Sequence, residues 1–505
     1  MPLSSLQFLR LSEMSYLSLF FISLTFLLLL RRIKNKPRLH LPPGPPGLPI
    51  IGNLHQLGAL PHRSLHRLAT TYGPYMHIRL GHIPTLVISS PAGAHEILKT
   101  HDLKFCTRPQ LTTWQCLSYG GLDLCFAPYS DYWIQMRKMS SVELFNAKRV
   151  QLLQPIREQE VHSLVESIAK ASALGEAVNL DEMILSLLSN VACRITFGKR
   201  FARDGECGRS KFHDMIKETI RLMGGFVAGD FFPSMHRILN VVTGVQRRLD
   251  RNSGEMDRFL EKIITERERC GYEDDFASVL LRVQKDPNFP VALTRDHIKA
   301  MLMITFIAGS DTAAVNIVWA MTELMRNPIA LKTAQEEVRR VGQGKEKVEE
   351  SDLPLLHYNK MVVKESLRLH PSGPLILPRE CREDCRIDGY DIPAKTRVYI
   401  NAFAIGRDPK TWEEPEEFRP ERFEHSPIEF KGKNFELVPF GGGRRICPGM
   451  AMGAAIVELA LANLLFKFDW TLPNGMSSNE IDMGESFGVV VGRKVPLLLT
   501  ATLPN

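Results

Sequence analysis

The sequence predicts a mainly α-helical protein with small β-sheets, an α+β fold. Seven segments have helical periodicity, whereas alternating runs of β-branched residues are few and short. Hydrophobic residues make up 44% of the 505 residues, which is enough for one large core. The seven helical segments are residues 156–171, 180–197, 211–223, 254–268, 294–326, 330–341 and 360–369.

The N-terminus contains a run without charged residues, residues 14–30. As a helix this run would be about 26 Å long, close to the thickness of the hydrocarbon layer of a membrane. We expect a transmembrane anchor there, preceded by a lumenal segment, residues 1–13. A cleavable signal peptide is the alternative, but a basic cluster at residues 31–38 follows the run, instead of a small-residue cleavage site. This positive charge places the following chain in the cytosol.

A proline-rich stretch, residues 41–49, comes next, and its fixed proline torsions favour an extended spacer. Together with the basic cluster it predicts a hinge over residues 31–49, followed by the main body over residues 50–505. A ligand for a proline-binding module is the alternative for such a stretch.

Only a few segments of the body predict strands. Residues 75–89 contain alternating and β-branched runs that predict a hairpin with its turn at 81–84. Residues 397–400 and the C-terminal end of the chain are also expected to form short strands.

The longest predicted helix covers residues 294–326, with Thr294 as its N-cap. It is apolar on nearly every face between residues 300 and 307, so we expect it to cross the interior of the molecule. The sequence Ala-Gly-Ser-Asp-Thr at residues 308–312 is expected to interrupt it.

The net charge of +7 is small for 505 residues and is partly confined to the N-terminal cluster, so nucleic-acid binding is not indicated. The nine cysteines are odd in number and scattered, unlike a disulfide framework, which favours a reducing compartment. Cys381 and Cys385 could pair on a metal, but no second pair accompanies them.

Residues 440–449, Phe-Gly-Gly-Gly-Arg-Arg-Ile-Cys-Pro-Gly, are the most informative segment. Three consecutive glycines permit a tight loop against a bulky, flat group, and Pro448 suits the first turn of a helix over residues 450–466. The N-terminus of that helix and Arg445 would stabilise a Cys447 thiolate, which is what a sulfur ligand to iron requires. A buried inert cysteine is the alternative.

This segment resembles the haem-binding loop of the cytochrome P450 enzymes. It matches the pattern Phe-x-x-Gly-x-Arg-x-Cys-x-Gly at every fixed position, namely Phe440, Gly443, Arg445, Cys447 and Gly449. The resemblance implies the cytochrome P450 fold, with haem b between the long central helix and the helix after the cysteine, and with Cys447 as the axial ligand.

Glu365 and Arg368 lie three residues apart and share a helix face, like the Glu-x-x-Arg motif of this family. Arg422 belongs to a later Pro-Glu-Arg-Phe motif that in the family joins the first pair. The role implied for these three residues is structural: they hold the cysteine loop.

Residues 308–312 resemble the oxygen-activation groove of the family. Gly309 leaves room for dioxygen, while Asp311 and Thr312 offer a carboxyl and a hydroxyl group for proton transfer. A helix-bending threonine beside a surface aspartate is the alternative.

Trp133 and Arg137 resemble the Trp-x-x-x-Arg motif that holds a haem propionate. Arg108, Arg379 and Arg445 stand where similar proteins place further propionate partners, and guanidinium groups suit carboxylates because they form paired hydrogen bonds.

The resemblance covers essentially the whole chain and is greatest to the plant microsomal group of specialised metabolism. It implies a monooxygenase that uses O2 and NADPH-derived electrons delivered by NADPH–cytochrome P450 reductase, with cytochrome b5 as a further candidate donor. It also implies a single-pass protein in the lipid bilayer of the endoplasmic reticulum, with its catalytic domain in the cytosol. The expected substrate is a small lipophilic terpenoid, phenylpropanoid or alkaloid precursor, held by Phe306, Ala308, Leu375, Phe487 and Val489.

Two other functions stay open on the residues alone. An isomerase or dehydratase of the same fold would rearrange a peroxide or an oxime without a reductase. A non-catalytic, membrane-tethered haem protein would not turn over at all. Ser372 departs from the second proline that relatives often carry, which bears on substrate choice.

Overall fold

The computed structural model describes residues 39–504 except 201–210, 226, 272 and 487. The expected lumenal segment, the anchor and most of the basic cluster therefore lie outside the described residues. The described residues form two compact units, one of residues 42–385 with 392–504, the other of residues 39–41 with 386–391. The smaller unit carries most of a two-stranded ribbon of β5 Cys385–Ile387 and β6 Tyr390–Ile392.

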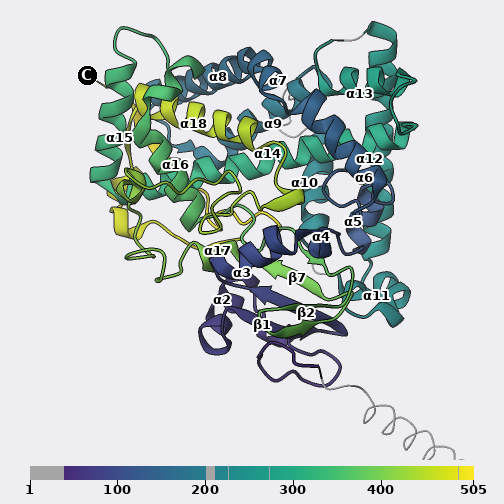
Figure 1. Ribbon diagram of the computed structural model, residues 1–505. Helices are drawn as coiled ribbons and strands as arrows, with labels where there is room; N and C mark the ends of the chain where they lie inside the picture. Colours follow the sequence, from purple (N-terminus) through teal and green to yellow (C-terminus); the bar gives the residue numbers. More distant parts are fainter. Residues whose placement is uncertain (1–38, 201–210, 226, 272, 487, 505) are drawn as a thin grey trace, which may run out of the picture. The chain divides into compact units, whose positions relative to one another are not determined.

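Helices dominate the larger unit, as the periodicity predicts (Figure 1). All seven predicted helices form, within a few residues of their expected ends except at the start of α12. They are α8 Gln154–Ala173, α9 Leu180–Phe197, α10 Lys211–Gly224, α12 Val245–Cys270, α14 Arg295–Arg326, α15 Pro328–Val341 and α16 His357–Leu369. The others are α2 Pro61–Tyr72, α3 Pro91–His95, α4 Asp102–Phe105, α5 Thr112–Leu117, α6 Asp131–Met139, α7 Ala147–Leu152, α11 His236–Val242, α13 Phe276–Lys285, α17 Ala402–Ile405 and α18 Met450–Lys467.

The predicted hairpin is the start of a four-stranded sheet of order β1-β2-β7-β4. β1 Tyr75–Leu80 pairs antiparallel with β2 Ile83–Ile88, which pairs in parallel with β7 Arg397–Ile400, and β4 Arg379–Glu380 completes the sheet. Gly81 makes the turn with φ +60°, a conformation that favours glycine. The turn also packs closely against the segment of Phe231, because a Cβ at Gly81 would lie 2.5 Å from the carbonyl oxygen of that residue.

A second, three-stranded sheet joins distant parts of the chain in the order β3-β9-β8. Its strands are β3 Val178–Asn179, β9 Leu498–Thr502 and β8 Asp469–Thr471. The C-terminal strand expected from the sequence is therefore present, and it ties the C-terminus to the segment before α9.

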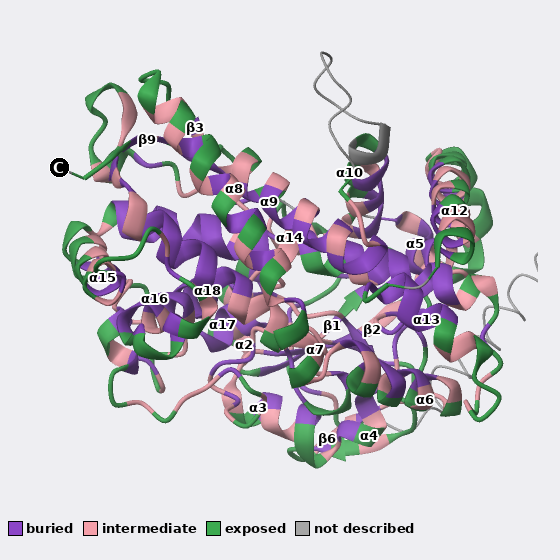
Figure 2. Ribbon diagram, turned by 90° about the horizontal axis from the view of Figure 1, so that it is seen from above, coloured by how far each residue is buried: buried purple, intermediate pink, exposed green. Residues whose placement is uncertain are grey.

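The central helix α14 begins at Arg295 and is capped by Thr294 together with His297. Figure 2 shows α14 and α18 largely buried among the other helices, whereas α12 and α15 present exposed residues along their lengths. The expected interruption at residues 308–312 is absent, because α14 is one unbroken helix of 32 residues. Thr312 donates its hydroxyl to the carbonyl oxygen of Ala308 one turn earlier, 2.7 Å away, which an intact helix accommodates.

The proline-rich stretch lies against the first sheet from Pro42 onward. The amide of His77 in β1 donates to the carbonyl oxygen of Pro43 at 2.9 Å, and Asn53 donates to that of Pro45 at 3.1 Å. Residues 42–49 are thus held by the larger unit and do not stand free as a spacer.

Two of the described helices, α14 and α18, are long and apolar enough to cross a membrane by length and composition alone. Both are core helices of the larger unit, with Trp319 and Leu464 among their most buried side chains.

Candidate active site

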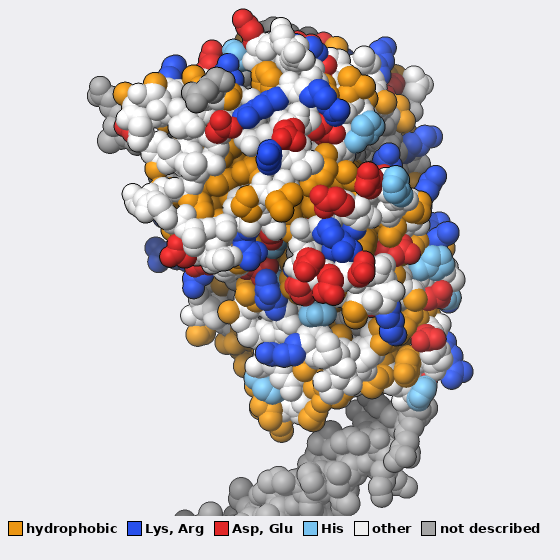
Figure 3. Space-filling view, turned by 90° about the vertical axis from the view of Figure 1, so that its left-hand side faces the viewer, with side chains coloured by type: hydrophobic (Ala, Val, Ile, Leu, Met, Phe, Trp, Pro, Cys, Tyr) orange, Lys and Arg blue, Asp and Glu red, His pale blue; other side chains and the backbone are white. Residues whose placement is uncertain are grey.

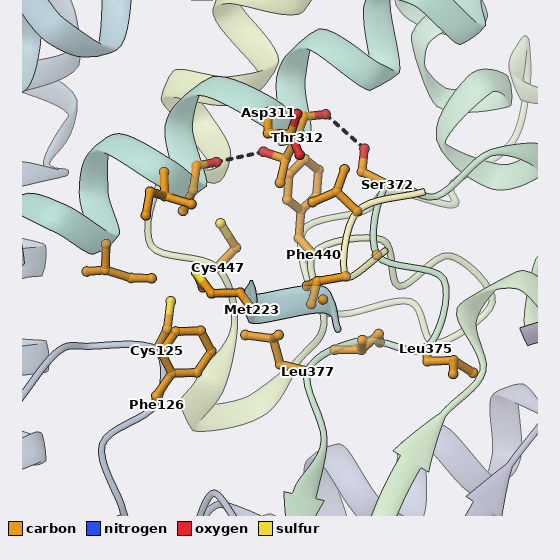
Figure 4. A pocket seen from close by; sticks show the side chains of 18 of the residues that line it. Cys125, Phe126, Met223, Asp311, Thr312, Ser372, Leu375, Leu377, Phe440 and Cys447 are labelled. Carbon is orange, nitrogen blue, oxygen red and sulfur yellow. Dashed lines mark hydrogen bonds between the residues drawn. The ribbon is translucent and has the colours of Figure 1, made fainter. Parts of the chain in front are cut away.

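A cavity of about 570 Å³ lies between α14, the cysteine loop and the segment of residues 372–378. Its walls are largely apolar, and residues 111–126 contribute a further side. Figure 4 shows Asp311 and Thr312 on α14 above Cys447, with Leu375 toward one side and Cys125 and Phe126 toward the other. The cavity therefore brings one thiol of the cysteine loop and the carboxyl and hydroxyl groups of α14 to a common space.

The cysteine loop is held by backbone contacts on both sides of Cys447. The amide of Cys447 donates to the carbonyl oxygen of Phe440 at 3.0 Å, and α18 begins three residues after the cysteine. Gly443 has φ +63°, and a Cβ there would lie 2.3 Å from the carbonyl oxygen of Leu98. The glycine is required because the loop packs directly against that backbone.

Burial raises the pKa of the Cys447 thiol, while the Gly449 amide and the nearby charge of Arg137 oppose the rise. The expected contribution of the helix N-terminus is therefore present, through Gly449. The cation that acts on the sulfur is Arg137, whereas the sequence led us to expect Arg445. The guanidinium of Arg445 instead donates to the carbonyl oxygens of Cys106 and Ala127, both at 2.7 Å.

The other residues expected to bind propionates also direct donors to backbone carbonyls. Arg108 donates to Cys125 and Leu377, and the Trp133 indole donates to Leu124, at 2.6–2.9 Å. Arg379 does not line the cavity; it forms a buried ion pair with Asp102 at 2.8 Å.

Arg137 differs from these residues because its guanidinium lines the cavity with no hydrogen-bonded acceptor among the described residues. Burial lowers its pKa, and the facing thiols Cys447 and Cys125 oppose that change. A partly buried cation with unused donors fits an anionic group of a ligand.

The expected groove on α14 faces the cavity through Ala308, Gly309, Asp311 and Thr312. A Cβ at Gly309 would meet nothing within 4 Å, so the missing side chain leaves open space there. Burial raises the pKa of Asp311 to about 6. Ser372, the departure noted in the sequence, donates its hydroxyl to the carbonyl oxygen of Thr312 at 2.9 Å and also lines the cavity.

Asp311 also borders a second cavity, of about 540 Å³. Charged side chains line this one, namely Asp181, Lys217, Arg221 and Arg493. Asp311 thus lines both the apolar cavity beside Cys447 and the second cavity, whose lining includes charged side chains.

The three residues of the expected structural network are in direct contact. Arg368 and Glu365, both fully buried, form a two-bonded pair at 2.7 Å, and Arg422 donates to the same carboxylate at 2.9 Å. The remaining donors of Arg368 reach the carbonyl oxygens of Gly406 and Pro415 at 2.6 Å. The buried charges are therefore fully hydrogen-bonded, the condition under which a buried ion pair is tolerated.

Of the expected substrate-lining residues, Ala308, Leu375 and Val489 line the cavity. Phe306 does not: it is buried against Phe197 of α9, with ring centroids 5.6 Å apart. The correction follows from helix geometry, because Phe306 lies two residues, about 200°, from the cavity-facing Ala308. Phe487 lies outside the described residues.

Several residues of the cavity were not predicted individually, among them Cys125, Met223, Arg397 and His62. Cys125 lies in the segment just before the Trp-x-x-x-Arg motif, and this closeness to the motif could have identified it as a cavity residue. Met223 and Arg397 come from a helix end and a strand whose sequence carries no motif, so only the fold brings them together. The Sγ atoms of Cys381 and Cys385 are 3.7 Å apart, and no group of three metal-ligating side chains is found in the described part of the chain.

The family model described as cytochrome P450 matches residues 42–499, most of the chain. The chain belongs to the cytochrome P450 family. It is 50% identical to cytochrome P450 71A9 of Glycine max over 95% of this chain and 98% of that protein. It is 47% identical to strychnine-11-hydroxylase of Strychnos nux-vomica over 98% of each chain. A zebrafish cytochrome P450 solved with abiraterone covers 88% of this chain and 100% of its own, at 25% identity and a TM-score of 0.74.

As a cytochrome P450 similar to plant family-71 members, the protein is a haem-containing monooxygenase that uses O2 and NADPH-derived electrons from a reductase. The residues fit haem in three respects. The cavity holds a buried thiol, a cation without an acceptor, and open space beside Gly309. A thiol ligand, a propionate partner and room for dioxygen are the groups that this cofactor needs.

Proposed function

We propose that this cytochrome P450 inserts one oxygen atom from O2 into a small lipophilic plant specialised metabolite of the terpenoid, phenylpropanoid or alkaloid type. One observation carries the proposal: the Cys447 thiol and the Asp311–Thr312 pair line a single apolar cavity. The likeness to strychnine-11-hydroxylase, named for an alkaloid substrate, supports the class of molecule. The cavity volume, about 570 Å³, suits a small lipophilic ligand.

In this proposal the Cys447 thiolate would bind the haem iron. When bound, haem supplies oxygen binding and O–O cleavage, which an electron-donating thiolate favours. Asp311 and Thr312 hold and transfer protons, and Gly309 keeps the space beside them open. Arg137 holds a propionate, and Arg108, Trp133 and Arg445, which line the same cavity, complete that side. The Glu365–Arg368–Arg422 network keeps the cysteine loop in position.

The ligand assignment is tested by the spectrum of the reduced protein with carbon monoxide. The full-length protein should give the thiolate-type Soret band, and Cys447→Ala should lose it. Cys125→Ala is the matched control, because Cys125 is a second thiol that lines the same cavity, and its loss should leave the band intact. A band that survives Cys447→Ala in folded protein would exclude this ligand.

The reaction is tested with microsomes that contain the protein, a panel of lipophilic metabolites, and mass spectrometry. Product that carries one added oxygen should require both NADPH and the NADPH–cytochrome P450 reductase, and cytochrome b5 is expected to act as a second electron donor. Turnover of a peroxide or an oxime without the reductase would instead identify an isomerase or dehydratase.

The proposal extends to the location of the enzyme, a single-pass protein of the endoplasmic reticulum membrane. Residues 14–30 form the anchor, 31–41 the link to it, and the catalytic domain lies in the cytosol. The exposed side chains of Ile238, Val241 and Val242 on α11 support a membrane-facing surface. Figure 3 shows the side of the molecule away from α11, where hydrophobic side chains also gather at the lower end.

Flotation with phosphatidylcholine vesicles tests this location. Removal of residues 1–38 should weaken vesicle binding, and changing Val241 and Val242 to lysine in the shortened chain should weaken it further. Leu174→Lys is the control, because Leu174 is 73% exposed but lies at the C-terminal end of α8, away from α11. Equal flotation of all variants would contradict the membrane-facing role of α11.

A further inference from the structure

The wall of the cavity includes one cation that the proposed chemistry does not use, Arg397 of β7. Its side chain is only 5% exposed and lines the same cavity as Cys447. It makes one hydrogen bond, 3.3 Å long, to the carbonyl oxygen of Asp230, and its Nε has no partner. No ion pair of Arg397 is found within the described ranges.

This bonding is poor for a buried guanidinium, which stays charged at every accessible pH and offers five N–H donors. Buried donors without acceptors are costly, more so when the group is charged. Arg379, on the neighbouring strand β4, pairs with Asp102 at 2.8 Å, and Arg368 has every nitrogen bonded. Arg397 therefore retains donors that the protein itself does not satisfy.

Two carboxylates beside Arg397, those of Glu380 and Asp230, are already engaged by other residues. Glu380, opposite Arg397 across the β4–β7 pair, bonds to Lys395 at 2.9 Å. Asp230 accepts from the amide and the hydroxyl of Thr112, at 2.9 and 2.5 Å. Neither carboxylate forms an ion pair with Arg397.

The position of the guanidinium is nevertheless fixed. Its central carbon lies 5.5 Å from the ring centroid of Phe231, a cation–π distance. Alternation along β7 puts Tyr399 on the same face as Arg397, and both residues line the cavity with Leu80 and Leu375. The donors thus stand at an apolar wall, in the space that a lipophilic substrate would fill.

We propose that Arg397 binds an oxygen acceptor of the substrate, so that the enzyme selects oxygenated lipophiles over hydrocarbons of equal size. A carboxylate is the best match, because its two oxygens fit the guanidinium fork. The inference rests on the proposed function and narrows its substrate class. Arg397 acts as a specificity-determining residue in it, and takes no part in oxygen chemistry.

The test is binding of three matched probes to the haem-loaded protein by equilibrium dialysis: citronellic acid, its methyl ester, and the hydrocarbon in which a methyl group replaces the carboxyl. Wild type should bind the acid most tightly, then the ester. Arg397→Met should weaken acid binding by about 10- to 100-fold, as expected for a charge-assisted hydrogen bond, and leave hydrocarbon binding unchanged. Arg397→Lys keeps the charge but loses the two-pronged guanidinium group, so its affinity for the acid should lie between those of wild type and Arg397→Met. This variant also controls for a folding defect in the methionine variant.

Arg79→Met is the control, an exposed arginine of the same sheet that should alter no probe. The same probe preferences in wild type and Arg397→Met would overturn the proposal. So would a loss of haem from Arg397→Met without a change in preference, because Arg397 would then serve the cofactor. Dialysis needs no turnover, so a failure of the monooxygenase assignment appears separately, in the carbon monoxide spectrum of the wild type.

Discussion

Asp311 is a titratable residue of the site whose pKa is changed by burial. Burial raises its pKa to about 6, whereas an unfolded aspartate titrates near about 3.9. The protonated carboxyl therefore contributes stability that is fully present below about pH 4 and is lost as the pH rises through about 6.

Asp311→Asn should remove this pH dependence. The unfolding temperature of the variant, relative to wild type, should rise as the pH increases from about 4 to about 7, measured by calorimetry. Asp296→Asn, an exposed change in the first turn of the same helix, should not reproduce the rise. A difference that stays constant with pH would show that Asp311 titrates normally.

Thr312 presents its hydroxyl to the same cavity. Thr312→Val keeps the size of the side chain but removes the donor, so the fraction of NADPH that ends in product should fall by about tenfold, with hydrogen peroxide as the balance. Thr305→Val is a matched control, because Thr305 also lines the cavity and also bonds one turn back along α14, to Met301. Equal coupling in the two variants would contradict the role of Thr312.

At the scale of elements, α16 is fixed to the segment before the cysteine loop by the hydrogen bonds of Arg368 to the carbonyl oxygens of Gly406 and Pro415, and by the ion pair of Glu365 with Arg422. Arg368→Met would remove one of the two cations that pair with the buried Glu365 carboxylate, at a cost of about 3–5 kcal/mol, and should lower the unfolding temperature and the yield of haem-loaded protein. Arg419→Met breaks the exposed pair with Glu413 in the same region and should change the unfolding temperature little. A similar fall in unfolding temperature in both variants would mean that the buried pair stabilises the protein no more than the exposed pair does.

The long helices could be predicted from sequence because most carry a periodic apolar stripe over several turns, and α14 carries a long apolar run. α9 and α10 begin at the expected residues, and α14 ends at Arg326 as expected. The helices that were missed, such as α2, α5 and α13, are shorter, and burial against the rest of the fold stabilises them more than their own pattern does. The expected break in α14 was wrong because a single glycine and a back-bonded threonine weaken a helix without ending it.

At the scale of the whole molecule, motifs predicted the groups that carry the chemistry, because those groups sit in fixed local patterns. Cys447, Asp311 and Thr312 line one cavity as expected. Pairwise distances across the fold were not predictable: Phe306 faces the core, and Arg397 reaches the cavity from a strand that no motif marks.

The haem should stabilise the whole molecule, because the cavity holds a cation that only a ligand can satisfy. Arg137→Met should therefore raise the unfolding temperature of the haem-free protein and lower the haem-to-protein ratio after purification. Lys138→Met, the next residue and exposed, should change neither quantity. Full haem retention in Arg137→Met would remove Arg137 from the propionate side.

Asp311 borders two cavities, and this has a consequence for how protons reach the site when a substrate is bound. A substrate that fills the apolar cavity beside Cys447 leaves the carboxyl group of Asp311 in contact with the second cavity, whose lining includes charged side chains. The second cavity would then still give this carboxyl group a contact with solvent, so that proton exchange at Asp311 would not depend on the space that the substrate occupies.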